Sequence, residues 1–202
     1  KEIAKLLLQI NAIKLETETL FTWASGKKSP IYCDNRLTLS YPEVRSYIQE
    51  CFFKIFKSNF QETDVIAGVA TGGIPHGVLL AEKVNLPFIY LRPSKKKHGR
   101  KNRIEGAIKS GENVLVVEDL VSTGKSSLNA MEPLLDLGCN ISGLISIFSY
   151  NFPGTKKLMQ LHKINHKSLS NYNVLIETAV EEKFISIEKL NFLEKWNKNF
   201  KI

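Results

Sequence analysis

Short runs of apolar residues alternate along the chain with segments in which apolar residues recur every three or four positions. Uninterrupted apolar runs are typical of strands buried on both faces of a parallel sheet, and the longer spacing is typical of amphipathic helices. The runs predict four strands, at residues 65–69, 87–91, 114–117 and 141–148. The spacing predicts helices at residues 1–13, from Pro42 onward, at 74–84 and at 124–137. This alternation predicts an α/β fold, with a parallel sheet flanked by helices.

Two regions lie outside the alternation. Residues 20–34 read as a β-hairpin, because a Ser-Gly-Lys-Lys turn separates two strand-like segments. The tail after Phe152 has a helical pattern at 177–184 and 187–199. We expect these parts to pack together beside the sheet.

The chain shows no internal repeat and no linker, so we expect one domain spanning residues 1–202. Its core is predicted at about 42–152, and a small hood at about 1–40 together with part of the tail. Ligands of parallel sheets bind at the carboxyl ends of the strands. Those ends carry Ala70-Thr71-Gly72-Gly73, Arg92, Glu118-Asp119 and Ser149.

The charge balance suggests an anionic partner. The chain has 202 residues, a formal net charge of +8 and a sequence pI near 9.3. Nucleic acid, a membrane surface or a phosphorylated small molecule would each fit, and so would a generally basic proteome. The segment from Arg92 to Arg103 holds seven Lys or Arg residues and no acid, and its run of three lysines at 95–97 would by itself favour a solvated loop or a nucleic-acid-binding patch.

Several classes of protein are excluded by composition. Apolar residues make up 43% of the chain, enough for a core that needs no disulfide or metal. The three cysteines form no CxxC pair, which argues against a zinc site and a disulfide framework. No apolar run reaches the length of a membrane span, and the N-terminal segment lacks the features of a secretory signal. A reducing cytoplasm is the predicted location.

The segment from Val114 to Ser127 carries the most specific chemistry. Its Gly124-Lys125-Ser126 suggests an ATP-binding P-loop, but that motif needs a glycine where Asp119 stands. Instead, an apolar strand leads to two adjacent acids and then to a hydroxyl-rich turn that opens a helix. The free N–H groups of a helix start can hold a phosphate, while the acids can meet sugar hydroxyls. A sugar 5-phosphate fits this spacing.

The segment Glu118-Asp-Leu-Val-Ser-Thr-Gly-Lys-Ser126 resembles the phosphoribosyl diphosphate (PRPP) signature of type I phosphoribosyltransferases. Three further blocks, in the family's order, resemble the orotate phosphoribosyltransferases: residues 21–36, 68–77 and 90–99. The signature alone is common to the superfamily, whereas the hairpin block and the Arg…Lys-x-His-Gly loop are specific to the orotate enzymes. The resemblance covers about residues 20–150 and implies a type I phosphoribosyltransferase-like parallel sheet.

The resemblance also implies a reaction. Members of this family transfer the ribose 5-phosphate of PRPP to N1 of orotate, giving orotidine 5-phosphate and diphosphate, in de novo UMP synthesis. The implied cofactor is Mg²⁺, bound mainly through PRPP, with contact to Asp119 through water left open. The implied assembly is a homodimer in which a mobile loop reaches into the partner's site. No nucleic acid and no membrane is implied as a partner.

Site residues follow from the resemblance position by position. The implied PRPP-binding residues are Thr71, Gly72, Arg92, Lys96, His98, Glu118, Asp119, Leu120, Val121, Ser122, Thr123, Gly124, Lys125 and Ser126. Within this set, residues 123–126 would hold the 5-phosphate, the two acids the ribose hydroxyls, and the turn at 70–73 the diphosphate. The implied catalytic residues are Lys96, His98 and Asp119, and the implied orotate-binding residues are Ser122 and Tyr32.

The chain departs from the family at the orotate site. Ala24 stands where some members have a lysine, and Lys27 or Lys28 is a candidate for the missing charge. No arginine follows Phe148, so the orotate carboxylate is expected to use backbone groups of the hairpin. Three further positions differ from those of many family members. Lys97 stands in place of an aspartate, Pro93 in place of a second loop lysine, and Lys125 in place of a glycine.

Two other functions are alternatives. A purine phosphoribosyltransferase would have a different hood, and a PRPP-sensing nucleic-acid-binding regulator would have little need for the Arg92, Lys96 and His98 loop. Other residues are expected to be structural or at the surface: His76 structural, His162 and His166 at the surface, and Trp23 and Trp196 in packing.

Overall fold

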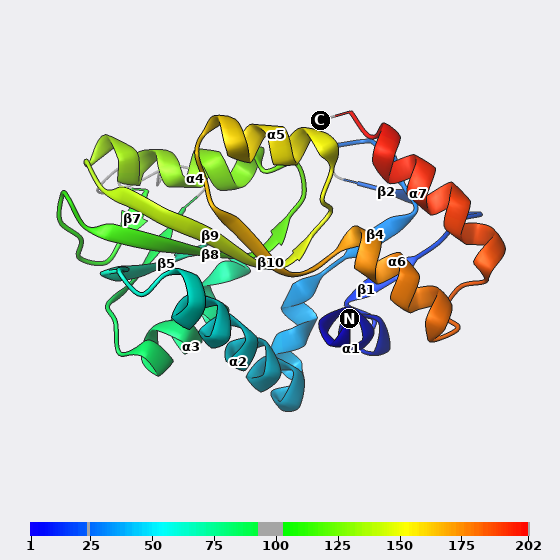
Figure 1. Ribbon diagram of the computed structural model, residues 1–202, viewed down its shortest axis with the longest axis horizontal. Coiled ribbons are helices and arrows are strands. Elements are labelled where there is room, and N and C mark those ends of the chain that lie inside the picture. Colours follow the sequence, from blue (N-terminus) through cyan, green and yellow to red (C-terminus); the bar gives the residue numbers. More distant parts are fainter. Residues whose placement is uncertain (24, 93–102, 202) are drawn as a thin grey trace.

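The computed structural model describes residues 1–23, 25–92 and 103–201. Six strands form one sheet in the order β10-β9-β8-β5-β6-β7 (Figure 1). They are β5 (Val65–Val69), β6 (Phe88–Leu91), β7 (Ile104–Glu105), β8 (Asn113–Val121), β9 (Asn140–Ser149) and β10 (His166–Asn171). Neighbouring strands are parallel, except that β7 runs antiparallel to β6. The predicted parallel sheet flanked by helices is confirmed.

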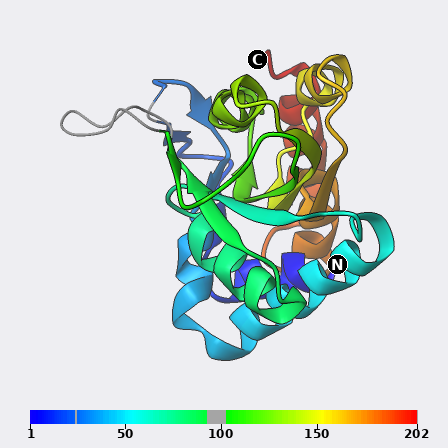
Figure 2. The same cartoon turned by 90° about the vertical axis from the view of Figure 1, so that its left-hand side faces the viewer.

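Helices cover both faces of this sheet (Figure 1, Figure 2). On one side lie α2 (Pro42–Asn59) and α3 (Gly73–Val84), and on the other α4 (Lys125–Asp136) and α5 (Pro153–Leu161). Successive strand residues serve opposite faces: Leu115 and Val117 pack in the cluster that includes α2 and α3, and Val114 and Val116 in the cluster that includes α4 and α5. Because both faces are buried, the central strands are almost entirely apolar, which explains why the apolar runs predicted them.

A group of smaller elements, here called the hood, lies at the carboxyl ends of the strands, where β10 leads into α6 (Figure 1). It contains α1 (Glu2–Gln9), β1 (Ile13–Leu15), β2 (Phe21–Thr22), β3 (Lys28–Ser29), β4 (Ile31–Cys33), η1 (Asn35–Ser40), α6 (Tyr172–Glu181), η2 (Ile187–Lys189) and α7 (Leu190–Asn199). The chain start and α6 are joined by ion pairs at 2.7 Å (Lys1–Glu181) and 2.9 Å (Lys5–Glu182). The division into hood and core remains a proposal.

An aromatic cluster holds α7 against the hairpin. The rings of Trp23 and Trp196 meet edge to face with centroids 6.0 Å apart, and Trp23 meets Tyr150 in the same way at 5.2 Å. Such ring pairs add to the apolar area that the rings bury. The packing role predicted for both tryptophans is confirmed.

The structure corrects the sequence reading at both ends of the chain. The first helix ends at Gln9 rather than residue 13, because Asn11 has a positive φ of 56°, a backbone conformation that ends helices. Residues 31–33 of the predicted hairpin pair with β1 instead of with β2. In the tail, residues 166–171, for which no element was predicted, form a strand at the edge of the sheet.

Two corrections concern the middle of the chain. The basic segment after β6 is followed by a short strand that was not predicted, β7, which pairs with β6. The strand predicted at 114–117 continues to Val121, so Glu118 and Asp119 lie within β8 rather than after it. Among the helices of the described ranges, none has the length and hydropathy needed to cross a membrane.

Candidate active site

The two acids lie where β8 extends past its neighbour. Pairing between β5 and β8 ends at Gly68 and Val117, whereas pairing between β8 and β9 continues to Val121 and Ser149. Glu118 and Asp119 therefore lie at the carboxyl edge of the sheet, beside the turn that joins β5 to α3. This is the edge at which ligands of parallel sheets bind.

Asp119 lies directly against the turn at residues 70–73. A Cβ placed on Gly72 would come 2.5 Å from Asp119 Oδ1, so a larger residue here would force this carboxyl group to move. A Cβ on Gly73 would instead collide with the backbone carbonyl of Val117. The Ala70–Thr71 peptide bond in this turn is cis. The structure thus brings together two sets of residues that the sequence assigned to ribose and to diphosphate.

Glu118 and Asp119 have different environments. Glu118 is buried, with 7% of its surface exposed, and its Oε1 accepts a hydrogen bond from the Asp119 N–H at 3.1 Å. Burial, followed by the neighbouring Asp119, raises the pKa of Glu118 well above its ordinary value. Asp119 is partly exposed. Asp119 is therefore the acid that a substrate can reach, and Glu118 supports the strand backbone beside it.

The predicted phosphate loop is a tight turn at the start of α4. Gly124 has a positive φ of 81°, and the Leu128 N–H makes the first helical bond, to the Gly124 carbonyl at 3.0 Å. The N–H groups of residues 125–127 precede that bond, so they can receive an anion. The Ser127 hydroxyl is buried and has no hydrogen-bond partner in the described structure. The geometry fits a bound phosphate.

Helix α5, which the sequence did not predict, supports this loop from behind. Thr155 Oγ1 donates a hydrogen bond to the Ser122 carbonyl at 2.9 Å. A Cβ on Gly124 would lie 2.6 Å from Met159 Cε, so α5 packs directly on the turn. No sequence signal connected these residues, because the tail had no recognisable motif.

The remaining predicted residues are spread around this edge. Arg92 follows β6, and its Nη1 lies 3.7 Å from Glu105 Oε1 of β7. Tyr32 is 45% exposed, with its ring centroid 5.8 Å from that of Phe21. Lys96 and His98 lie outside the described residues, as do Ala24, Pro93 and Lys97.

The two candidate lysines of the hairpin have other partners. Lys27 Nζ donates to the Lys201 carbonyl at 2.7 Å and lies 4.5 Å from the centre of the Phe200 ring. Lys28 Nζ donates to Thr22 Oγ1 at 2.7 Å. Their contacts place both lysines on the hairpin and the C-terminal segment.

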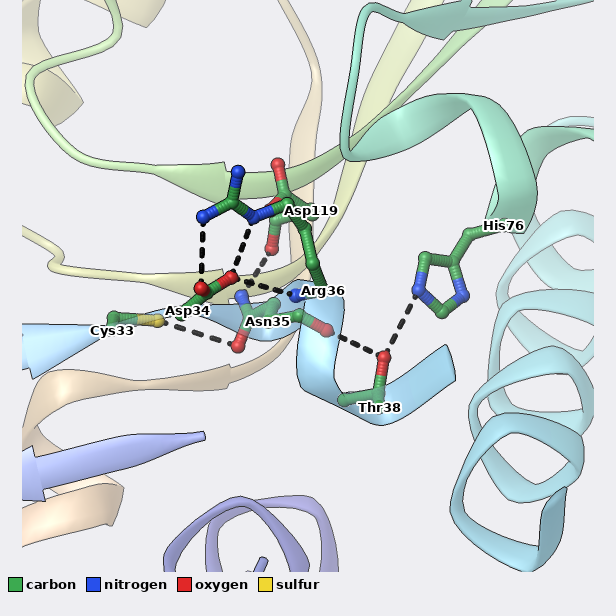
Figure 3. A network of polar contacts seen from close by, with 7 residues as sticks. All are labelled: Cys33, Asp34, Asn35, Arg36, Thr38, His76 and Asp119. Carbon is green, nitrogen blue, oxygen red and sulfur yellow. Dashed lines mark hydrogen bonds and ion pairs between the residues drawn. The ribbon is translucent and has the colours of Figure 1, made fainter. Parts of the chain in front are cut away.

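A polar network at the start of η1 reaches the site, and sequence reasoning missed it (Figure 3). Asn35 Nδ2 donates to the Asp119 backbone carbonyl at 2.7 Å. Arg36 binds Asp34 through Nε at 2.7 Å and Nη2 at 2.8 Å, which lowers the pKa of Asp34. Thr38 Oγ1 lies 3.2 Å from Nε2 of His76. Asp34, Asn35 and Arg36 belong to the hairpin block at residues 21–36, but nothing in its spacing pointed to position 119.

The structure confirms the prediction for His76 and corrects the prediction for His166. His76 is buried, with its pKa lowered to about 4 by burial, as expected for a structural residue. His166 is not simply at the surface: its Nε2 lies 2.9 Å from Ser146 Oγ, and burial lowers its pKa to about 4. His162 is exposed.

The acids fit a magnesium ion that arrives with its substrate. Across the described ranges, no group of three or more His, Cys, Asp or Glu side chains could form a complete metal cage. Mg²⁺ commonly uses one or two carboxylates, several waters and substrate phosphates. Asp119, partly exposed and facing the turn at Gly72, can serve as such a carboxylate.

Comparison with known proteins gives consistent results over most of the chain. The family model described as phosphoribosyl transferase domain matches residues 3–177. A Staphylococcus haemolyticus protein named orotate phosphoribosyltransferase is 47% identical over 199 residues, covering 98% of each chain. A Listeria innocua protein of the same name is 45% identical over 199 residues, covering 98% of this chain and 95% of that protein.

A solved structure agrees with these sequence relatives. The crystal structure of orotate phosphoribosyltransferase from Aeropyrum pernix superposes with a TM-score of 0.77 at 26% identity. The match covers 87% of this chain and 97% of the other.

Proposed function

The chain belongs to the orotate phosphoribosyltransferases of the phosphoribosyl transferase family, and from this premise we propose how its residues carry out the reaction. The enzyme transfers the ribose 5-phosphate of PRPP to N1 of orotate and releases diphosphate. The observation that carries the residue assignment is the contact between Asp119 and the turn at Gly72. PRPP carries its ribose hydroxyls beside its diphosphate, so one PRPP molecule would contact both Asp119 and the turn at Gly72.

In our proposal, PRPP is held at three points. The 5-phosphate accepts hydrogen bonds from the N–H groups at the start of α4 and from the hydroxyls of Thr123 and Ser126, at the positive end of the helix. Asp119 accepts hydrogen bonds from the ribose hydroxyls, with Glu118 supporting it. Backbone N–H groups at Thr71 and Gly72 receive the diphosphate.

Orotate would lie on the hood side of the ribose. Tyr32, with its half-exposed ring, would cover one face of the pyrimidine, and the Ser122 hydroxyl would contact its edge. Because Lys27 and Lys28 are held by other partners, backbone groups of the hairpin remain the proposed donors to the orotate carboxylate.

The chemical step needs charge stabilisation more than acid or base. As the bond from C1 to diphosphate breaks, positive charge develops on the ribose and negative charge on the leaving group. Arg92, Lys96 and His98 would stabilise the departing diphosphate. Mg²⁺, when bound with PRPP, supplies further positive charge to the phosphate oxygens. The segment with Lys96 and His98 would also exclude water, which would otherwise hydrolyse PRPP.

One assay tests this function. Loss of orotate absorbance in the presence of PRPP and Mg²⁺ is expected, with no comparable turnover of adenine, hypoxanthine or uracil. Purine turnover without orotate turnover would favour the purine alternative, which the relatives' names do not support. Turnover that persists in EDTA would show that the reaction does not require a divalent metal.

We also propose a homodimer with shared sites, in a reducing cytoplasm. The three cysteines are free thiols, which supports the reducing compartment. If Lys96 serves the partner's site, mixing Lys96→Ala chains with Asp119→Asn chains creates heterodimers with one intact site. Two nearly inactive parents should then give about half of wild-type activity per heterodimer, by the count of intact sites. Mixtures that stay inactive despite proven exchange would show that each loop serves its own chain.

A further inference from the structure

The side chain of Asn35 joins the hood to the acidic strand. It is 1% exposed, and its amide group donates to the Asp119 carbonyl at 2.7 Å across 84 positions of sequence. Its Oδ1 accepts a hydrogen bond from Cys33 Sγ at 3.3 Å. Burial, with Asp119 and Asp34 nearby, raises the pKa of the Cys33 thiol, so the thiol keeps the proton that it donates. Both ends of the Asn35 amide are thereby fixed (Figure 3).

The carbonyl that Asn35 binds lies on the part of β8 that has lost its β5 neighbour. The last pair between these strands is Gly68 with Val117, two positions before Asp119. Beyond that pair, β5 leads into the turn before α3, and the Asn35 amide from the hood donates to the partly buried Asp119 carbonyl. A hydrogen bond at such a position stabilises the strand end and fixes it relative to the hood.

The other end of the same segment is attached to α3. Thr38 Oγ1 donates its one proton to the Asn35 carbonyl at 2.6 Å, so His76 Nε2 must donate to Thr38 Oγ1 at 3.2 Å. The buried Nδ1 of His76 then carries no proton and has no partner in the described structure. Residues 35–38 are thus held between β8 and α3, the two elements that carry Asp119 and the turn at Gly72.

We propose that Asn35 is a positioning residue for the transfer step, an inference that rests on the proposed function. Tyr32, which would cover the pyrimidine, lies in β4, three residues before Asn35, the first residue of η1. Asp119, which would hold the ribose, lies at the other end of the Asn35 hydrogen bond. This bond sets the distance between the two substrates, so that orotate N1 faces C1 of the ribose.

Such a role predicts a specific kinetic effect. A displacement of about 1 Å between reacting groups can cost on the order of 100-fold in rate, even when each substrate still binds. PRPP is held mainly by β8, α4 and the turn at 70–73, none of which requires Asn35 for its own hydrogen bonds within the sheet or helix. Loss of the bond should therefore lower kcat and leave PRPP affinity nearly unchanged.

Two variants and a matched control test this proposal. Asn35→Asp keeps the shape but removes the donor to the Asp119 carbonyl, and Asn35→Ala removes the side chain. The control is Asn197→Ala, because Asn197 is also buried, at 6% exposure, and its Nδ2 donates to the Tyr150 carbonyl at 2.7 Å. The Asn197 side chain thus joins the hood to the residue that follows β9 by the same kind of hydrogen bond, and it does not contact Asp119. The readouts are Tm, PRPP Kd by calorimetry, and kcat and KM for orotate.

We expect a 10- to 100-fold fall in kcat for both Asn35 variants, with PRPP Kd within about 2-fold of wild type. Asn197→Ala should keep kcat at a similar loss of Tm. Turnover of orotate by Asn197→Ala tests the proposed function independently of the proposed role of Asn35. The proposal is overturned if the Asn35 variants keep wild-type kcat, lose it only as much as Asn197→Ala does, or lose PRPP affinity in parallel. Should neither Asn35 variant fold, Asn35→Ser replaces them, because its hydroxyl is too short to reach the Asp119 carbonyl from the same backbone position, and unchanged kcat there has the same consequence.

Discussion

At the scale of the residue, two neighbouring acids of one strand differ in burial and in the groups that they contact. Glu118 and Asp119 differ by one position, so their side chains point to opposite sides of β8. One becomes buried and accepts the N–H of the other, and the second faces the turn at Gly72. The sequence could predict that both acids lie near the sheet edge, because an apolar run precedes them. It could not tell which is buried, since this depends on the elements that cover each face.

Glu118 should make stability depend on pH in a defined direction. Its raised pKa means that the folded protein prefers the protonated acid, so stability is full below the unfolded value near 4.5 and falls as the pH rises above it. Glu118→Gln cannot titrate, and its amide oxygen can still accept the Asp119 N–H. We expect its Tm to match wild type near pH 4 and to exceed it by a few degrees at pH 8.

Thermal unfolding between pH 4 and 8 measures this difference. The exposed Glu62 provides the control, and Glu62→Gln should follow wild type throughout. A Glu118→Gln protein that is less stable than wild type at pH 8 would show that the charged carboxylate is favoured in the fold.

At the scale of the element, the turn between β5 and α3 shows how glycine can serve binding and folding separately. Gly72 faces a side chain that can move, and Gly73 faces the backbone of β8. Gly72 has a φ of −68°, which alanine adopts readily. The effect of a methyl group at Gly72 therefore comes from contact with Asp119 and not from backbone strain.

The two glycines should give contrasting variants. Gly72→Ala should keep a Tm close to wild type but bind PRPP at least about 10-fold more weakly, because the Asp119 carboxyl must move, and about 1.4 kcal/mol suffices for this change. Gly73→Ala should lower Tm markedly or prevent folding, because a carbonyl of the central strand must shift. Thermal unfolding and PRPP calorimetry on both proteins check this. If Gly72→Ala binds PRPP as tightly as the wild type does, Asp119 is not part of the PRPP site.

The elements that sequence reasoning missed have a common physical cause. β10 has the sequence His166-Lys-Ser-Leu-Ser-Asn171 and lies at the sheet edge, where one partner strand suffices and few apolar residues are needed. β7 has two residues and, within the described part of the chain, pairs with β6 alone. Central strands such as β5 must be apolar on both faces and are therefore recognisable. The Asn35 link to Asp119 is invisible for another reason: it depends on the tertiary position of residues 84 apart.

At the scale of the whole molecule, buried neutral histidines make the fold sensitive to acid. The pKa of His76 is lowered to about 4 by burial, below its ordinary value of 6.5. Its contribution to stability is thus present above pH 6.5 and is lost as the pH falls toward 4, because the unfolded chain takes up the proton first. The same direction holds for His166.

His76→Gln should make stability less dependent on pH in this window. Glutamine can donate to Thr38 but does not titrate, so the variant should lose about 3 kcal/mol less than wild type between pH 7 and 4. Urea unfolding at several pH values measures it, with the exposed His162→Gln as control. Parallel pH curves for wild type and His76→Gln would mean that His76 is protonated equally easily in both states.

The aromatic contact between the hairpin and α7 has a spectroscopic consequence. The chain has two tryptophans, and both lie in the hood, in one cluster with Tyr150 and Phe200. The intrinsic emission of the protein therefore reports on a boundary and not on the central sheet, whose backbone is followed by far-ultraviolet circular dichroism. If the hood loosens before the sheet melts, the emission maximum will shift to the red at a lower denaturant concentration than the ellipticity changes. The protein thus contains its own label for the opening of the surface through which orotate would enter.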